Sequence, residues 1–355
     1  MKENTAEEMH PTLGQEKLSI EVTTRCNGSC LHCFARSNIS RQSSLPVDLV
    51  KGIIAEGYDA GYRHLHITGG EPLLWKGLFE VLDHGFGCGY KTIFMNTNGT
   101  LITDEISKRL AGYGSFFSMS ISLDGPEALH ERIRGRGSYQ KTMQGIDKAL
   151  NRGNDLTIFT TITKSLLVEM PLFVDELFRS FPRIKYLILI QLLRTTNGTN
   201  ALSEELISPE DFIRLVRMVA LLAVGGFRTI VKKNPLASVV SKMLETPWIP
   251  QVPPLYREGS MIVMANRHIG LVHSNRDNFG LYRPGMIKKI LTSEKYRLAV
   301  APDQITCPMC KYAQPCEESG MIRPPQGYGD FNADKPYCRR VLDRISPDKP
   351  VWRAK

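Results

Sequence analysis

Three cysteines lie within eight positions in the stretch TTRCNGSCLHCFARS (23–37). Their spacing, C-x3-C-x2-C, puts Cys26, Cys30 and Cys33 on one short loop. Four thiolates close a metal site, whereas three leave one position open. The same reasoning applies to an iron–sulfur cluster in which each iron takes one cysteine. The loop could hold three corners of a cubane, a zinc ion with a distant fourth ligand, or no metal, and spacing alone leaves cluster and zinc equally open.

A second set of cysteines lies near the C-terminus, at Cys307, Cys310, Cys316 and Cys338. Only Cys88 stands apart from both sets, and a small buried side chain is its ordinary interpretation. The N-terminal stretch lacks the apolar segment of a secretory signal, and no apolar run is long enough to cross a bilayer. We therefore expect a cytoplasmic protein, in which cysteines favour metal binding over disulfides.

The composition is that of an ordinary globular protein, with 42% hydrophobic and 23% charged residues. A chain of 355 residues is long enough for one large domain and a smaller one. The net charge of +9 would suit a nucleic-acid-binding protein. The basic residues are scattered, however, without a long tract or alternation with aromatic residues. A solvated surface, or a site that attracts an anionic substrate, is the better interpretation.

Short β-like segments alternate with amphipathic helical stretches up to about residue 225. The expected strands are 18–23, 63–68, 91–96, 116–123, 156–163 and 185–191. Ser44, Thr103 and Ser208 are expected N-caps of helices, and Ser208 forms a capping box with Asp211. This alternation predicts parallel strands joined by right-handed crossovers. The fold class we expect is α/β, with a partial (β/α)6 TIM-like barrel rather than a full eightfold one.

Polar and glycine-rich motifs follow most of the expected strands. Cys26 follows the first strand, GGEP (69–72) the second and NTNG (96–99) the third. SLDG (122–125) ends the fourth strand, and Gln191 ends the sixth. The carboxyl ends of parallel strands share one edge of a sheet, where such folds carry their chemistry. We therefore expect these motifs to gather there.

The alternation is expected to stop after about residue 226, where proline and glycine become frequent. We expect a mobile tail over 1–16, a barrel over 17–225 and a small metal-containing domain over 226–355.

The C-x3-C-x2-C loop after the first strand, followed by GGEP after the second, resembles the radical S-adenosylmethionine (SAM) superfamily. The resemblance covers about residues 17–225. It implies that Cys26, Cys30 and Cys33 hold a 4Fe–4S cluster whose open iron chelates the amino and carboxylate groups of SAM. One electron, delivered by a reducing partner such as flavodoxin or ferredoxin, then cleaves SAM into methionine and a 5′-deoxyadenosyl radical.

The resemblance also assigns cofactor contacts. Gly69, Gly70 and Glu71 match the turn that meets the methionine amino group, where glycines allow close approach to the ligand. Ser122 matches the position that contacts the ribose. Arg134 matches an arginine that pairs with the SAM carboxylate, although a surface cation is the ordinary alternative.

Three further positions carry weaker expectations. Asn96 and Asn98 lie where members of the family place polar contacts, although Asn-Gly is equally an ordinary turn. His32 stands where members usually have Tyr or Phe against the adenine. An imidazole can still stack there, so we include His32 among the cofactor-binding residues.

The C-terminal cysteines resemble the end of the SPASM domain, which normally binds two auxiliary clusters. Only the ligands of one are present, so the resemblance implies a shortened SPASM or twitch-type domain. In it Cys307, Cys310, Cys316 and Cys338 would bind a second 4Fe–4S cluster. Four protein ligands leave no position for substrate, so electron transfer is the expected role. A zinc ribbon is the alternative.

SPASM-type enzymes act mostly on peptides or proteins. We therefore expect a radical SAM oxidoreductase that modifies a peptide or protein, such as a peptide or metalloenzyme maturase. One alternative is an enzyme acting on a small molecule in cofactor or natural-product biosynthesis. Another is a non-catalytic iron–sulfur or zinc protein that binds nucleic acid. His273 and Asp277 are candidates for proton transfer, although a strand His and a turn Asp explain them as well.

Overall fold

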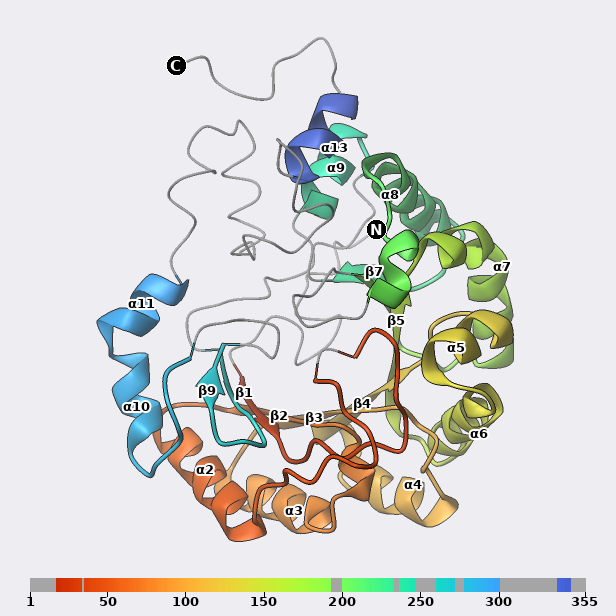
Figure 1. The fold of residues 1–355 in the computed structure, drawn as a ribbon. Coiled ribbons are helices and arrows are strands. Elements are labelled where there is room, and N and C mark those ends of the chain that lie inside the picture. The colour runs from red at the N-terminus through yellow and green to blue at the C-terminus, as the bar shows by residue number, and fades with distance from the viewer. Residues whose placement is uncertain are drawn as a thin grey trace, which may run out of the picture.

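The structure is a computed structural model that describes seven parts of the chain (Figure 1). These parts are residues 17–33, 35–192, 200–232, 236–246, 260–271, 278–300 and 337–345. Within them the strands form one sheet in the order β7-β6-β5-β4-β3-β2-β1-β8-β9. Figure 1 shows this sheet as a curved wall, with α2 to α8 arranged along its outer side.

The predicted strands are all present in this sheet. They are β1 (Leu18–Glu21), β2 (His64–Thr68), β3 (Thr92–Thr97), β4 (Phe117–Ser122), β5 (Asp155–Ile162) and β6 (Leu187–Gln191). Each pairs in parallel with the next along the chain. The α/β class with a partial barrel is therefore confirmed.

Three short strands that the sequence analysis did not predict extend the sheet at both edges. β7 (Thr229–Lys232) lies parallel to β6, and β8 (Met261–Val263) lies parallel to β1. β9 (Ile269–Gly270) pairs antiparallel with β8. The expectation that strand–helix alternation ends near residue 226 was wrong, because β7 continues it. Segments of two to four residues are too short to show the two-residue period of a strand.

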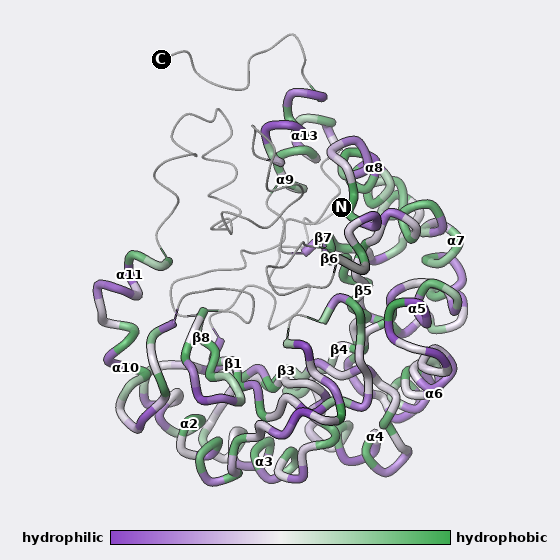
Figure 2. Tube along the Cα trace, in the orientation of Figure 1, coloured by the Kyte–Doolittle hydropathy of each residue, from purple (hydrophilic) through white to green (hydrophobic). Residues whose placement is uncertain are grey.

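The helices cover the outer face of the sheet. Between the predicted strands lie α2 (Val47–Asp59), α3 (Leu78–Cys88), α4 (Asp104–Ala111), α5 (Glu127–Arg134), α6 (Ser138–Asn151) and α7 (Lys164–Ser180). The later ones are α8 (Pro209–Val224), α9 (Leu236–Met243), α10 (Met286–Leu291), α11 (Glu294–Val300) and α13 (Tyr337–Ile345). Hydrophilic and hydrophobic stretches alternate along the outer helices in Figure 2, as burial of one side requires. No helix in the described ranges has the length and apolar character needed to span a membrane.

The N-termini of the helices show which of the predicted N-cap residues were correct. Thr103 caps α4 by accepting a bond from the Ile106 amide, and Ser208 forms the expected capping box at α8. Ser44 was wrong as the cap of α2, because that helix begins after Pro46. The Ser44 hydroxyl lies instead 2.6 Å from that of Thr23, at the end of β1.

The two faces of the sheet differ in polarity. Side chains on the outer face, such as Ile20 and Ile67, are fully buried in the main core under the helices. On the inner face, Ser19 Oγ lies 3.1 Å from His66 Nδ1, and Asn96 hydrogen-bonds to both His66 Nε2 and Ser120 Oγ. A chain of polar contacts therefore crosses the inner face from β1 to β4.

The described C-terminal elements attach at opposite edges of the barrel. Glu56 on α2 accepts bonds from the Tyr282 hydroxyl at 2.6 Å and from the Ile287 amide of α10 at 2.7 Å. The Tyr337 hydroxyl of α13 lies 3.0 Å from the Ser208 carbonyl at the start of α8. These contacts fasten α10 and α13 to the barrel.

Candidate metal centre

The three N-terminal cysteines lie on the loop between β1 and α2, next to the carboxyl end of the sheet. Cys26 is buried, and its amide donates to the Asn38 carbonyl at 3.1 Å. Cys30 and Cys33 are half-buried. Burial is the main cause that raises the pKa of the Cys26 thiol to about 11, and the nearby Glu71, Cys30 and Cys33 raise it further. The thiols therefore lie close enough to interact electrostatically.

Three thiols on one loop fit a cluster in which each iron takes one cysteine. Within the described residues, no group of three or more His, Cys, Asp or Glu side chains is placed to hold one metal ion. A zinc ion would draw its thiolates to about 2.3 Å from a common point. A cubane takes each thiolate on a different iron and so spreads them apart. Two of the sulfurs lie beside Gly28, because a Cβ added to Gly28 would lie 3.7 Å from Cys30 Sγ and 3.8 Å from Cys26 Sγ.

Each of the three sulfurs has an N–H group directed at it. The pairs are Gly28 N to Cys26 Sγ (3.3 Å), Asn98 Nδ2 to Cys26 Sγ (3.9 Å), Ser37 N to Cys33 Sγ (3.4 Å) and Arg134 Nη1 to Cys30 Sγ (3.8 Å). Such donors favour the thiolate form, which is the form that binds metal. Hydrogen bonds to sulfur also influence the reduction potential of a bound cluster.

The glycine-rich turn after β2 packs against the chain that leads into the cysteine loop. The Gly70 amide donates to the Thr23 carbonyl at 2.6 Å, and the Glu71 amide donates to the Arg25 carbonyl at 2.8 Å. A Cβ on Gly70 would lie 2.2 Å from the Arg25 carbonyl oxygen, and one on Gly69 would lie 2.7 Å from that of Thr23. The close approach that these glycines allow is therefore to the protein's own backbone.

Replacing Gly70 by alanine is expected to destabilise the protein by about 1–3 kcal/mol, because backbone must move to admit the methyl group. The same movement displaces the segment before Cys26, so reconstituted protein is expected to bind less iron. The matched control is Gly52→Ala, since a Cβ on Gly52 in α2 meets nothing within 4 Å. Iron per chain and the unfolding midpoint measure both effects, and wild-type values in the Gly70 variant would contradict the prediction.

The Glu71 side chain links the end of β2 to the end of β3 through hydrogen bonds. Its side chain is fully buried and accepts bonds from Thr97 Oγ1 at 2.7 Å and the Asn98 amide at 2.8 Å. A weaker bond from the Leu73 amide, at 3.2 Å, caps the short 3₁₀ helix η1 (Pro72–Leu74). Burial raises the pKa of Glu71, and these bonds oppose that rise. The carboxylate is thus directed into the protein, so the SAM contact predicted for Glu71 would fall to its backbone.

Asn98 contacts the cysteine loop, whereas Asn96 lies on the inner face of the sheet. Asn98 Nδ2 donates to Asn27 Oδ1 at 2.8 Å, so Asn98 holds the cysteine loop. Asn96 belongs to the polar chain on the inner face of the sheet, between His66 and Ser120. Ser122, at the end of β4, is half-buried, and its hydroxyl has no hydrogen-bond partner among the described residues.

Asp124 joins two of the predicted cofactor residues. It is fully buried, and its Oδ2 accepts a bond from Arg134 Nε at 2.6 Å and lies 2.9 Å from His32 Nε2. Its Oδ1 accepts a bond from the Thr161 amide at 2.7 Å. Burial alone would raise the pKa of Asp124, but Arg134 and His32 hold it well below its usual range. Asp124 is therefore an anion that orients both side chains.

Asp124 was not among the predicted site residues, although it lies in the SLDG motif (122–125). An acid at the end of a barrel strand was the available signal. The surface-cation alternative for Arg134 was wrong, since its side chain is only 12% exposed. His32 Nδ1 is buried without a hydrogen-bond partner among the described residues. A polar atom left unpaired beside the cysteine loop fits a site that receives a cofactor.

Several predicted site residues lie outside the described residues. They are His273, Asp277, Cys307, Cys310 and Cys316. Cys338 is described and is buried in α13. The second cluster and the proton-transfer residues therefore remain predictions.

Comparison with known proteins gives consistent matches. The radical SAM superfamily model matches residues 20–170. An AdoMet-dependent heme synthase from Methanosarcina barkeri is 33% identical over 199 residues, covering 55% of each chain. A mycofactocin maturase from Mycolicibacterium smegmatis is 30% identical over 149 residues, covering 41% of this chain and 38% of the relative. The chain spans about half the length of the first curated relatives it matches.

Solved structures match over more of the chain at lower identity. The structure of anSMEcpe with bound AdoMet has a TM-score of 0.72 and 17% identity, covering 93% of this chain and 96% of that one. Streptococcus suis SuiB bound to its precursor peptide SuiA has a TM-score of 0.64 and 14% identity, covering 83% and 69%. These likenesses establish the fold. The radical SAM superfamily model matches residues 20–170, which contain the cysteine loop, so this part of the chain is similar to that superfamily.

Proposed function

We propose that this chain is a radical SAM oxidoreductase that binds a 4Fe–4S cluster through Cys26, Cys30 and Cys33. When bound, the cluster supplies one electron to SAM, and the resulting 5′-deoxyadenosyl radical takes a hydrogen atom from the substrate. The observation that carries the proposal is the open three-cysteine loop, whose sulfurs each receive an N–H donor. Arg134 provides a fixed positive charge beside it, suited to a SAM carboxylate.

Cleavage of SAM tests this proposal without knowledge of the substrate. Anaerobically reconstituted protein with dithionite and SAM is expected to form 5′-deoxyadenosine and methionine, measured by mass spectrometry. Protein freed of iron by a chelator is the control and is expected to form neither. Absence of both products from iron-loaded protein would instead support a non-catalytic iron–sulfur protein.

The substrate we propose first is a peptide or protein. Its support is the fold shared over most of the chain with SuiB, solved with its precursor peptide, and with anSMEcpe, solved with bound peptides. A mycofactocin maturase is also among the curated relatives.

A small-molecule substrate is the second candidate. Several relatives of comparable identity are named AdoMet-dependent heme synthase, Fe-coproporphyrin III synthase and GTP 3′,8-cyclase. Deuterium transfer distinguishes the two classes, because the radical takes its hydrogen from the true substrate. Two deuterated candidates would be compared: peptides encoded by genes next to this one, and Fe-coproporphyrin III. The true substrate is the one whose deuterium appears in 5′-deoxyadenosine.

The C-terminal part of the proposal rests on the cysteine pattern alone. Within residues 226–355, the part that follows the strands added to the barrel sheet would form a small domain in which Cys307, Cys310, Cys316 and Cys338 bind a second 4Fe–4S cluster. A flavodoxin or ferredoxin would supply the electrons. Iron and zinc contents of the cysteine variants, argued in the Discussion, test the second cluster.

A further inference from the structure

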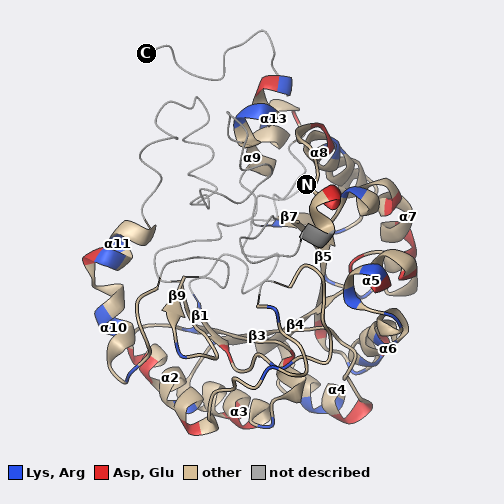
Figure 3. Cartoon of the chain, in the orientation of Figure 1, with Lys and Arg blue, Asp and Glu red and all other residues tan. Residues whose placement is uncertain are grey.

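The loop that carries the three cysteines is basic and contains no acidic residue. Residues 22–47 include Arg25, Arg36 and Arg41 but no Asp or Glu. All three arginines are exposed. In Figure 3, Lys and Arg (blue) and Asp and Glu (red) occur both around the strands and on the outer helices. The loop that carries the cysteines thus has three cations and no acid of its own.

Backbone and side-chain contacts gather the three arginines around Asn38. Arg25 forms a β-bridge with Asn38, and the Arg41 amide donates to the Asn38 carbonyl at 3.2 Å. The Arg36 carbonyl accepts bonds from Asn38 Nδ2 and Arg41 Nε, each at 3.4 Å. Arg36 adopts a left-handed backbone conformation, with φ at 48°, which is uncommon for a residue other than glycine. The grouping is therefore built into the fold of the loop, and we call Arg25, Arg36 and Arg41 the arginine patch.

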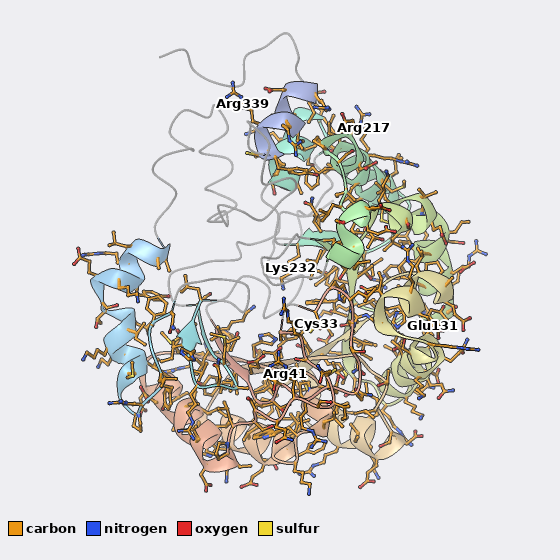
Figure 4. All side chains as sticks on the ribbon, viewed as in Figure 1. Cys33, Arg41, Glu131, Arg217, Lys232 and Arg339 are labelled. Atoms are coloured by element: carbon orange, nitrogen blue, oxygen red, sulfur yellow. The ribbon has the colours of Figure 1, made fainter. Side chains whose placement is uncertain are left out.

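The arginine patch lies directly against the cysteines. The Arg36 amide donates to the Cys33 carbonyl at 3.2 Å, and the Cys26 amide donates to Asn38. Figure 4 shows Cys33 and Arg41 in the same region, whereas Arg217 on α8 lies far from both. An electron that enters through the patch would therefore have only a short distance to cross.

In the part of the chain that the structure describes, no acid is paired with the arginine patch. Within the described residues, Arg25, Arg36 and Arg41 form no ion pair with a carboxylate. Glu71, the nearby acid, is fully buried and directed at Thr97 and the Asn98 amide. An exposed apolar side chain lies in the same loop, because Ile39, next to Asn38, is 55% exposed. An exposed apolar group surrounded by cations is suited to association with an acidic protein surface.

We propose that the arginine patch is the docking surface for a small acidic electron-transfer protein that reduces the cluster held by Cys26, Cys30 and Cys33. This inference rests on the proposed function. The reduced partner loses one electron and the cluster gains one, and no covalent bond forms or breaks. Opposite charges on the two surfaces steer the encounter, so association is fast at low ionic strength and weakens as salt screens it.

The test compares two triple variants with the same change of net charge. One is Arg25→Glu/Arg36→Glu/Arg41→Glu in the patch. The control is Arg214→Glu/Arg217→Glu/Arg283→Glu, at exposed positions outside the patch. Flavodoxin, an acidic flavoprotein, serves as the probe. Its dissociation constant is measured by calorimetry with iron-loaded protein at low and high salt, and SAM cleavage is measured with either reduced flavodoxin or dithionite as reductant.

The patch variant is expected to bind flavodoxin at least about tenfold more weakly at low salt and to lose most of the salt dependence. Its flavodoxin-driven cleavage of SAM should fall while its dithionite-driven cleavage stays at the wild-type level. The control triple should resemble wild type.

Equal binding by the two triples would overturn the inference and leave the proposed function standing. Loss of dithionite-driven cleavage in iron-loaded patch variant would also overturn it, because the arginines would then act on SAM. If wild type cleaves no SAM with dithionite, the proposed function fails. The dissociation constants of flavodoxin would still test whether the arginine patch is a docking surface.

Discussion

Replacing Cys26, Cys30 and Cys33 together by alanine is expected to remove about four irons per chain and to abolish SAM cleavage. One cysteine binds each iron of a 4Fe–4S cluster, so without these thiolates the N-terminal cluster has no protein ligands. The N–H groups that are directed at the sulfurs cannot replace them, because they donate to sulfur and cannot bind iron. Iron and zinc per chain in anaerobically reconstituted protein, beside 5′-deoxyadenosine formation, give the measurement.

The remaining iron tests the C-terminal set. Wild-type protein with two cubanes is expected to hold about eight irons, and the triple variant about four. A variant with no iron and about one zinc would make the C-terminal cysteines a structural site. Cys88→Ala is the control, because Cys88 lies at the end of α3, away from the cysteine loop. Unchanged iron content in the triple variant would contradict the assignment of Cys26, Cys30 and Cys33.

The gathering of the motifs at one edge could be predicted because it follows from parallel pairing. Once β1 to β4 are parallel neighbours, residues just after each strand must meet. Cys26, Gly70, Asn98 and Asp124 all occupy such positions, and their contacts confirm that they meet. This placement needed only the periodicity of each segment and the handedness of the crossovers.

What each side chain does there could not be predicted in the same way. The sequence places Asn96 and Asn98 two residues apart, yet one lies on the inner face of the sheet and the other holds the cysteine loop. Glu71 follows two glycines that suggest a ligand, but its carboxylate is bonded to Thr97 and the Asn98 amide. These roles depend on side-chain direction and on long-range partners, which local patterns do not contain.

Replacing Asp124 by asparagine is expected to destabilise the protein by about 3–5 kcal/mol. Asparagine can still accept the Thr161 bond, but its amide group cannot neutralise the buried Arg134. Asp155→Asn is the matched control, because Asp155 pairs with the partly exposed Lys185 at 2.8 Å. That change is expected to cost less than about 1 kcal/mol. Denaturant unfolding of the iron-free proteins measures both, and equal effects would contradict a special role for Asp124.

The effect of pH on the stability difference between wild type and Asp124→Asn follows from the direction of the pKa shift of Asp124. The pKa of Asp124 is lowered below its unfolded value of about 4, so the folded protein binds fewer protons at this site than the unfolded chain. Its stabilising contribution is complete above about pH 5 and is lost as the pH falls, by up to about 1.4 kcal/mol per unit. Burial, with the charge of Arg134, lowers the pKa of His130 to about 4, so His130 stays neutral in the upper range. The difference between wild type and Asp124→Asn should therefore be constant from about pH 6 to 8 and shrink below about pH 4.

A double variant separates the loss of the anion from the exposure of its partner. If Asp124→Asn is destabilising because it leaves the Arg134 charge uncompensated, then Asp124→Asn/Arg134→Gln should be more stable than Asp124→Asn alone. His32, whose Nε2 lies 2.9 Å from Asp124, would lose its orienting partner in both variants. SAM binding to the iron-loaded proteins should therefore stay weak in the double variant even where stability recovers. Recovery of both together would mean that neither Asp124 nor Arg134 is needed at the cofactor, whereas recovery of stability alone would assign the Asp124–Arg134 pair a part in cofactor binding.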